Sequence, residues 1–168
     1  MRPIAASRLM TVARRLLDAS TLCAIATVSA DGRAHVNPAY FAWSKELELV
    51  WLSEPRAKHS ANVRRSGTAA VSVYDSNQTW GKPDRGIQLF GTAREARGDD
   101  ARCAEAIYAK RFPALRELEL PAYGFYFFSP SRVKLFDERA FRTGVFLTAR
   151  VTRGALAWER TEIYDPGA

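Results

Sequence analysis

The sequence predicts a mainly β protein: an antiparallel barrel of about six strands, closed or nearly closed, with about three short helices. Strand patterns follow one another directly as a meander, which favours antiparallel pairing over alternation of strands with helices. The dipeptide Asp31-Gly32, between two of these patterns, is a strong hairpin signal. The chain is also rich in aromatic residues, with 9 Phe, 6 Tyr and 4 Trp. Closure of the sheet would keep aromatic strand edges from being exposed.

The first half of the chain is predicted to hold two helices and four strands. Residues 7–18 carry apolar side chains at helical spacing and form the first helix. A short helix follows Pro55 and runs to Arg64, and Gly67 suits its C-terminal end. The strands are expected over residues 21–29, 33–43, 47–52 and 68–74.

The second half continues with a polar loop over residues 75–84. The elements expected after it are a strand from Arg85 to about Arg94, a helix from Gly98 to Pro113, and an aromatic strand over residues 123–128. Residues 133–136 continue this strand after Ser129-Pro130-Ser131, and the weak pattern over residues 141–163 indicates one or two more strands. No repeat, linker or break in composition divides the chain. Residues 1–168 are therefore predicted to form a single domain, with a poorly defined tail after about residue 140.

Composition is that of an ordinary soluble globular chain, with 47% apolar and 26% charged residues. No apolar run approaches the ~20 residues that span a bilayer, and the N-terminus lacks the apolar stretch of a secretory signal. Cys23 and Cys103 stand in unrelated contexts, as is typical of free thiols in a reducing compartment. We therefore expect a cytoplasmic protein with no membrane partner.

The net charge of +7, from 25 basic and 18 acidic residues, raises the question of nucleic-acid binding. The arginines are spread along the whole chain, however, and a basic surface also attracts the phosphate of a mononucleotide. We expect no nucleic-acid partner. Binding to nucleic acid stays a third hypothesis, which predicts affinity that falls steeply with salt.

Familiar catalytic patterns are missing from the sequence. It contains no Gly-rich phosphate loop, no His-Glu-x-x-His helix and no Gly-x-Ser-x-Gly elbow. The only histidines are His35 and His59, so three imidazole ligands on one chain are excluded, and no metal site is predicted. Cys23 lies in an apolar strand, where burial would raise the pKa of its thiol. Hydrolase and zinc-enzyme functions are therefore poor interpretations.

The best candidate site runs from Trp51 to His59, where a predicted strand ends at Ser53 and a helix begins. A helix N-terminus presents unpaired N–H groups and a partial positive charge, which together bind an anion. The hydroxyl of Ser53 and the ammonium of Lys58 would strengthen such a site, and Arg56 could join them. The ligand would be a dianionic phosphate at one end of a flat molecule. The alternative is that Ser53 only caps the helix while the basic side chains are solvated.

A second cluster surrounds Pro38, inside the second strand pattern. Because proline cannot donate to a β-ladder, its position indicates a place where the ladder opens. Backbone groups freed there could meet the polar edge of a ring system, and Asn37 adds an amide. A simple bulge is the alternative.

In their order and spacing these segments resemble the FMN-binding split-barrel proteins related to pyridoxamine 5′-phosphate oxidase. The resemblance covers about residues 7–140, and the small uncharacterised branch with an Arg-Phe-Pro element is the most similar. The segments that carry it are the hairpin Asp31-Gly32-Arg33 with Pro38, the strand ending at Ser53, the helix start at Lys58-His59, the strand Arg85–Ala93, the element Tyr108–Pro113 and the strand Arg132–Asp137.

The resemblance implies a homodimeric split β-barrel with FMN at the subunit interface. The phosphate would lie against Ser53 and Lys58, the ring along the strands of Pro38 and Leu52, and a further strand would border the cofactor. The candidates for cofactor binding are Arg33, Asn37, Pro38, Leu52, Ser53, Lys58, His59, Arg85, Gly86 and Gln88.

The chain departs from true pyridoxamine phosphate oxidases in three places. It has Ala57-Lys58 where they have an Arg-Lys pair, and Gly86 where they have Gln. Residues 141–144 do not show their Arg-x-His substrate element. These differences argue against vitamin B6 oxidation and leave cofactor binding unaffected.

The leading hypothesis is a flavin-dependent oxidoreductase that acts on an unknown small-molecule substrate. Hydride transfer would proceed through the flavin N5, with the protein supplying position and electrostatics. No side chain is an obvious general acid or base, so no catalytic residue is predicted. The alternative is a non-catalytic module that binds flavin, deazaflavin or haem for carriage, sensing or storage. His35 or His59 could then serve as an axial haem ligand.

Overall fold

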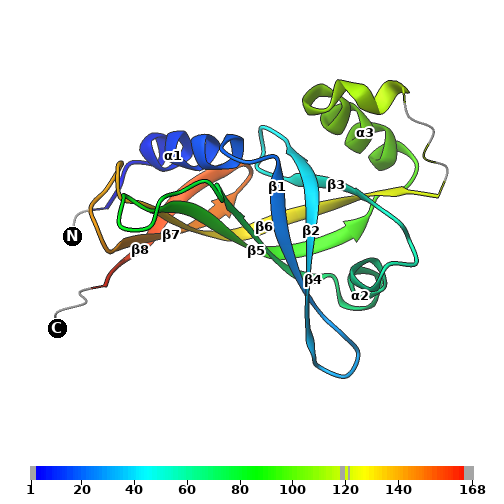
Figure 1. Ribbon diagram of the computed structural model, residues 1–168, viewed down its shortest axis with the longest axis horizontal. Coiled ribbons are helices and arrows are strands. Elements are labelled where there is room, and N and C mark those ends of the chain that lie inside the picture. The colour runs from blue at the N-terminus through cyan, green and yellow to red at the C-terminus, as the bar shows by residue number, and fades with distance from the viewer. Residues whose placement is uncertain (1–2, 118–119, 121, 165–168) are drawn as a thin grey trace.

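The computed structural model describes residues 3–117, 120 and 122–164 (Figure 1). Its helices are α1 (Ala6–Asp18), α2 (Lys58–Ser66), α3 (Asp99–Arg111) and the 3-10 helix η1 (Pro113–Glu117). Its strands are β1 (Leu22–Val28), β2 (Ala34–Trp43), β3 (Leu49–Ser53), β4 (Thr68–Tyr74), β5 (Arg85–Glu95), β6 (Gly124–Asp137), β7 (Val145–Thr152) and β8 (Ala155–Ile163).

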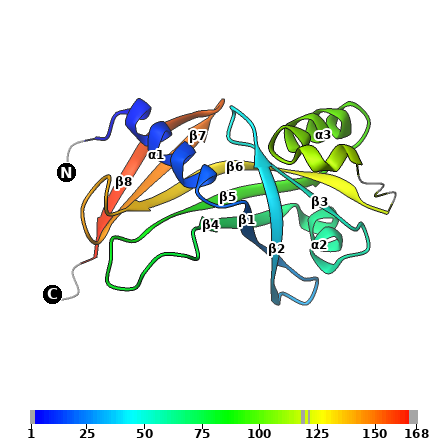
Figure 2. The ribbon, with the colours of Figure 1, turned by 45° about the horizontal axis from the view of Figure 1, so that its top comes forward.

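The strands form one antiparallel sheet in the order β3-β2-β1-β4-β5-β6-β7-β8. An additional pairing between β3 and β6 closes β1 to β6 into a six-stranded barrel. Strands β7 and β8 continue the sheet from β6 outside this ring (Figures 1 and 2). The predicted mainly β class and the six-stranded barrel are confirmed. The weakly patterned tail contributes two further strands.

Strand β6 belongs to both parts of the sheet. Its residues Gly124–Phe128 pair with β3, and its residues Arg132–Phe136 pair with β7. The predicted continuation of the aromatic strand past Ser129-Pro130-Ser131 is confirmed, and β6 includes these three residues. Pro130 stands opposite Gly91, where the register between β5 and β6 shifts. Such an irregularity accepts a residue that has no N–H to donate.

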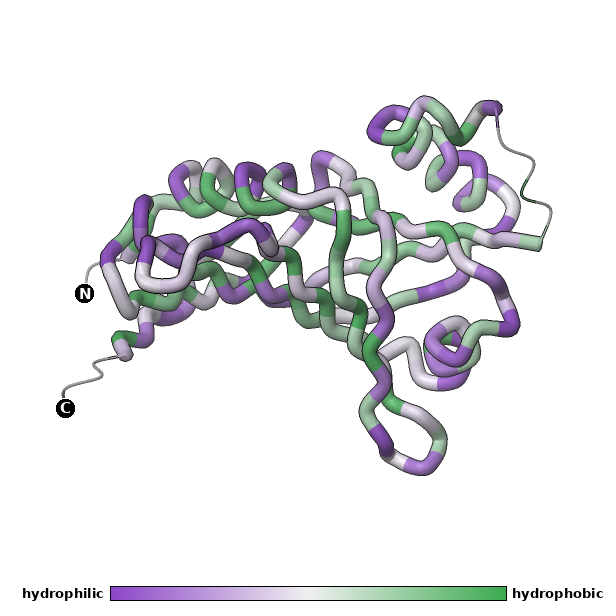
Figure 3. The backbone as a smooth tube through the Cα atoms, viewed as in Figure 1, coloured by the Kyte–Doolittle hydropathy of each residue, from purple (hydrophilic) through white to green (hydrophobic). Residues whose placement is uncertain are grey.

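The barrel interior and the space under α1 are filled by one large apolar core. Along β1 the buried side chains of Cys23, Ile25 and Thr27 alternate with more exposed ones, as expected for a strand with one inward face. The buried residues of α1 are Leu9, Val12, Ala13, Leu16 and Leu17. This stripe turns toward the strands, as the hydropathy colouring of Figure 3 shows. The helix predicted over residues 7–18 is thereby confirmed.

Helix α2 lies at one end of the barrel. Its C-terminal cap is Gly67, with φ of 68°, a left-handed conformation that glycine adopts without strain. The predicted role of Gly67 is therefore confirmed. The helix begins at Lys58 and not directly after Pro55, because a turn closed by the hydrogen bond from the Ala57 N–H to the Glu54 carbonyl comes first.

Arg111, at the end of α3, ties this helix to the barrel. Its guanidinium donates to the backbone oxygens of Leu17 (3.1 Å) and Ser20 (2.7 Å) at the end of α1. It also donates to the oxygen of Phe41 in β2 (3.1 Å) and lies 4.6 Å from the centre of the Phe41 ring. A second apolar cluster packs α3 against the outside of β2, β3 and β6. In the part of the chain described here, no helix is long and apolar enough to cross a membrane.

Candidate functional site

Strands β2 and β3 separate close to both clusters predicted from the sequence. They pair only over Phe41–Trp43 and Leu49–Trp51. In the described sheet, residues 34–40 of β2 have β1 as their sole strand neighbour. Strand β3 instead continues along β6 as far as Ser53. The barrel wall therefore opens between the first part of β2 and the end of β3.

Pro38 lies on the edge of this opening. The register between β1 and β2 continues through the pair Ala24–Pro38, so the alternative of a bulge is wrong. The Phe41 N–H donates to the Thr21 carbonyl, toward β1. Because backbone groups of an antiparallel strand alternate between its two sides, the nitrogen of Pro38 faces away from β1. The prediction that the ladder opens at Pro38 is confirmed on the β3 side of the strand.

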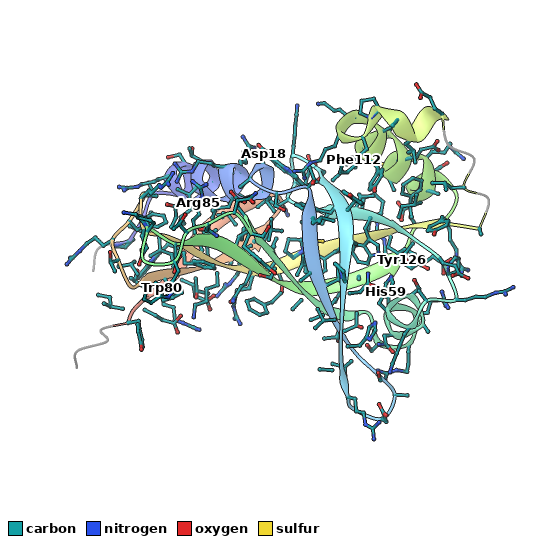
Figure 4. The ribbon with its side chains drawn as sticks, viewed as in Figure 1. Asp18, His59, Trp80, Arg85, Phe112 and Tyr126 are labelled. Atoms are coloured by element: carbon teal, nitrogen blue, oxygen red, sulfur yellow. The ribbon has the colours of Figure 1, made fainter. Side chains whose placement is uncertain are left out.

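Ser53 and His59 form a buried pair behind the opening. The Ser53 Oγ lies 2.6 Å from the His59 Nε2, and the two residues are only 7% and 5% exposed. The imidazole of His35, from the unpaired part of β2, lies parallel to that of His59, with ring centres 6.3 Å apart. Figure 4 shows His59 where α2 meets the strands. Burial lowers the pKa of His59, and the neighbouring His35 lowers it further, so the ring is neutral at pH 7.

The N-terminus of α2 remains open to an anion from outside. Its N-cap residue is Ala57, and among the described side chains none caps this helix, so the alternative that Ser53 is only a cap is wrong. The Ser53 hydroxyl is directed to His59. The first helical residue is Lys58, whose side chain is exposed. The first-turn N–H groups and an ammonium group therefore lie together where β3 ends.

The surroundings of α2 carry an excess of positive charge. Arg65 of α2 donates to the Val28 carbonyl and so joins the helix to the end of β1, next to the hairpin turn that bears Arg33. The exposed basic residues here are Arg33, Arg56, Lys58, Arg64 and Arg65, and the nearby acidic ones are Asp31, Glu54 and Glu95. This balance favours an anionic ligand at the α2 end of the barrel.

The outward residues of β2, β1, β4 and β5 form a surface that we call the outer face. Two rows cross its four strands: Pro38–Ala24–Ser72–Gln88 and Val36–Ala26–Ala70–Phe90. A hollow of about 290 Å³ lies over the middle of this face. Exposed apolar side chains surround the small central residues; they are Leu22, Val36, Tyr40, Tyr74 and Phe90.

The structure places the predicted ring-binding residues in different surroundings. Pro38 and Gln88 share one row of the outer face, three strand spacings or about 14 Å apart. Leu52 is half-buried and packs in the apolar cluster beneath α3. The side-chain amide of Asn37 donates to the Pro38 carbonyl over 2.9 Å.

Gly86 has a packing reason to be glycine. A Cβ at this position would collide with the ring of Phe136 on the neighbouring strand. The residue is buried, so Phe136 accounts for the absence of a side chain without a cofactor.

Arg85 lies far from α2, as Figure 4 shows for Arg85 and His59. Its guanidinium is 3.6 Å from the Asp75 carboxylate, and the Gln78 side chain bonds both its backbone N–H and its carbonyl. One chain therefore does not gather all the predicted residues around one ligand. They fall into a group at the α2 end, a group on the outer face, and Arg85 at the far end.

Two features escaped the sequence reasoning. The contact between His35 and His59 could have been sought, because strand alternation puts His35 on the same side of β2 as Asn37. The exposed Trp80 gave no signal, because it stands in a polar loop with no periodic pattern. Within the described residues, no group of three or more His, Cys, Asp or Glu side chains could hold a metal ion.

A family model described as "Pyridoxamine 5′-phosphate oxidase" matches residues 9–136. The chain belongs to this family. The resemblance predicted from the sequence is confirmed, and the opening between β2 and β3 lies within the matched segment of this pyridoxamine 5′-phosphate oxidase family member. A search of curated proteins gives no match.

Solved structures with the same fold are described as binding different groups. A haem-binding protein from Mycobacterium smegmatis matches with a TM-score of 0.69 and 18% identity over 92% of this chain. The chain spans 60% of the length of that protein. A FAD-binding protein from Mesorhizobium loti matches with a TM-score of 0.63 and 18% identity, over 81% of this chain and 95% of the other. HutZ from Vibrio cholerae, described as a haem storage protein, matches with a TM-score of 0.61 and 17% identity, over 70% and 87%. At these identities the likeness establishes the fold alone.

Proposed function

We propose that this chain is a homodimeric FMN-binding oxidoreductase that acts on a small-molecule substrate. The observation that carries the proposal is the open N-terminus of α2, with Lys58 beside it, at the place where the barrel wall parts. Membership of the pyridoxamine 5′-phosphate oxidase family supports it. Arg33, on the neighbouring hairpin turn and 3.5 Å from the Asp31 carboxylate, is the further candidate for contact with the phosphate.

The residues present fit both ends of such a cofactor. The N–H groups of the first turn of α2 and the Lys58 ammonium suit the phosphate. On the unpaired side of β2, the N–H groups of Val36 and Tyr40 face the opening, because they alternate with those directed to β1. These backbone donors suit the polar edge of a flat ring. Pro38 between them has no N–H, so it leaves room without leaving a donor unpaired.

Bound FMN would supply hydride or electron transfer. The chain's own residues would hold and orient it. The contact between Ser53 and His59 joins the end of β3 to the first turn of α2. It would thereby fix the direction of the N–H groups that would hold the phosphate. A neutral His59 keeps this support uncharged in its buried position.

A second copy of the chain would complete the site. Gln88 and Arg85 lie on the outer face and at the far end of the barrel, away from α2. A two-fold axis through the outer face exchanges its two ends, and so would bring β5 of one copy toward α2 of the other. The uncharged, partly apolar outer face supports pairing of this kind.

Replacement of Lys58 by alanine tests the phosphate end. Loss of one charge-assisted hydrogen bond weakens FMN binding by about 1.5–3 kcal/mol, or roughly 10- to 150-fold. The measurement is a titration of the apo-protein with FMN, followed by flavin fluorescence. Lys45→Ala, in the exposed turn between β2 and β3, is the matched control and keeps wild-type affinity. Equal affinity of the Lys58→Ala variant and wild type would contradict the assignment.

Haem binding at the same opening is a second candidate function, favoured by the parallel imidazoles of His35 and His59. The Nε2 of His59 is engaged by Ser53, so the half-buried His35 is the better axial ligand. The visible spectrum of the purified protein distinguishes flavin, deazaflavin and haem. Rapid reduction of bound flavin by a nicotinamide donor would separate an enzyme from a carrier.

A further inference from the structure

We infer that in a dimer the Trp80 side chain of each copy is an aromatic arm that packs on the α2 end of the other copy's outer face. The inference rests on the homodimer of the proposed function and adds a partner residue to it. Trp80 is 98% exposed, in the loop between β4 and β5. Because tryptophan is enriched at protein interfaces, the full exposure of Trp80 favours a contact with a partner surface.

The loop that carries Trp80 is held firmly at its base. The Gln78 side chain donates to the carbonyls of Asp75 (2.9 Å) and Arg85 (3.0 Å) and accepts from the Arg85 N–H (2.7 Å). The Asp75 carboxylate also accepts from the Asn77 N–H (2.9 Å) and lies 3.6 Å from the Arg85 guanidinium. Because the loop is already ordered, fixing Trp80 against a partner costs little conformational entropy.

The charge of the outer face selects a second copy as the occupant. The two rows that cross it contain no charged residue, although 26% of the chain is charged. Depletion of charge is typical of the centre of a protein interface. An acidic partner would bind a basic surface, whereas repulsion between two chains of net charge +7 is smallest when they meet through an uncharged one. The small residues Ala24, Ala26, Ala70 and Ser72 at the centre allow two such faces to come close.

The area of the face indicates that a further contact is needed. Four strands of about seven residues cover roughly 19 Å by 23 Å, on the order of 440 Å². A stable interface buries about 800 Å² on each partner. An exposed tryptophan adds about 200 Å², and each copy would bury both its own Trp80 and a similar area beneath the partner's. The outer face together with two Trp80 arms therefore reaches the area that a dimer requires.

The topology determines where the arm would reach. Strand β4 begins at Thr68, next to α2, and ends at Tyr74, where the Trp80 loop starts. Figure 4 shows Trp80 on the side of the molecule opposite His59. A two-fold axis through the small central residues of the outer face exchanges these ends. The Trp80 arm of one copy then lies over the α2 end of the other copy's outer face, where β4 begins.

The test compares wild type with Trp80→Ala by sedimentation equilibrium in the presence of FMN, and with Trp80→Phe by acrylamide quenching of tryptophan fluorescence. The difference in fluorescence between wild type and Trp80→Phe is the contribution of Trp80. In the wild-type dimer, we expect this contribution to be shielded from the quencher. Trp80→Ala should raise the dimer dissociation constant by at least about 30-fold. Tyr164→Ala, which removes another exposed aromatic side chain just after β8 and outside the four strands of the outer face, is the control and should leave the constant unchanged.

Failure of this inference can be distinguished from failure of the proposed function. A wild-type dimer that binds FMN but leaves Trp80 fully quenchable, with unchanged dimerisation of Trp80→Ala, overturns the arm alone. A wild type that stays monomeric at all concentrations with FMN overturns both the arm and the homodimeric site.

Discussion

Replacing Ser53 with alanine tests whether its hydroxyl supports the fold or binds the cofactor. The Ser53 Oγ lies 2.6 Å from the His59 Nε2, and both side chains are buried. The variant leaves that nitrogen without a hydrogen-bonding partner among the described side chains, which costs about 1–3 kcal/mol. For a domain of this size each kcal/mol lowers the Tm by about 2–4 °C. We therefore expect the Tm to fall by roughly 2–12 °C, with little change in FMN affinity.

The assay is a double-mutant cycle measured by urea unfolding of the apo-protein at pH 7.5. The variants are Ser53→Ala, His59→Leu and the two combined. Because the two side chains contact each other, their effects on the free energy of unfolding should be non-additive by at least about 0.5 kcal/mol. An FMN titration is carried out in parallel. Additive effects would contradict the contact between Ser53 and His59. Unchanged stability together with a tenfold loss of FMN affinity would show that the hydroxyl faces the phosphate.

The remaining predictions concern pH, packing and thiol chemistry. Because the folded protein lowers the pKa of His59 from 6.5, protonation favours the unfolded chain. At pH values below about 6.5, protonation of His59 should lower the free energy of unfolding by at most about 1.4 kcal/mol per pH unit. The urea midpoints of the His59→Leu variant should lack this dependence on pH. Arg111→Met removes three hydrogen bonds and should lower the free energy of unfolding by about 2–4 kcal/mol. The control Arg102→Met, on the exposed side of α3, should change it by less than about 0.5 kcal/mol. Equal effects of the two variants in urea unfolding would contradict the role of Arg111. Burial raises the pKa of Cys23 to about 12. A thiol reagent at pH 8 should therefore label only the exposed Cys103 until the protein is unfolded. Rapid labelling of the folded Cys103→Ser variant would count against this prediction.

Local chemistry made much of the fold predictable. Asp31-Gly32 marks a turn because glycine accepts the positive φ that a tight hairpin requires, and Gly67 ends α2 for the same reason. A closed barrel was predictable, but the pairing of β3 with β6 that closes it was not. This pairing joins segments more than seventy residues apart and leaves no local signal in the sequence. The tail was weakly patterned because four polar residues in succession, 159–162, occupy both exposed and partly buried positions of β8.

The candidate site was predictable where it depends on one segment. The open N-terminus of α2 beside Lys58 follows from a strand end, a turn and a helix start in sequence order. The partner of Ser53 could not be foreseen, because the turn between β3 and α2 determines that its side chain faces His59. The shared row of Pro38 and Gln88 depends on the register of four strands, which alternation of polar and apolar residues does not specify by itself.

Strand β6 belongs both to the barrel and to the extension formed by β7 and β8, which affects how the molecule unfolds. The ring closes without β7 and β8, yet Leu147 and Leu156 of those strands share one core with the barrel and with α1. Neither the ring nor the two-stranded extension can lose its structure while the other keeps its packing. Chemical denaturation should accordingly show one cooperative step by every probe, and a C-terminal truncation after β6 should leave a loosened molecule in place of a smaller intact barrel.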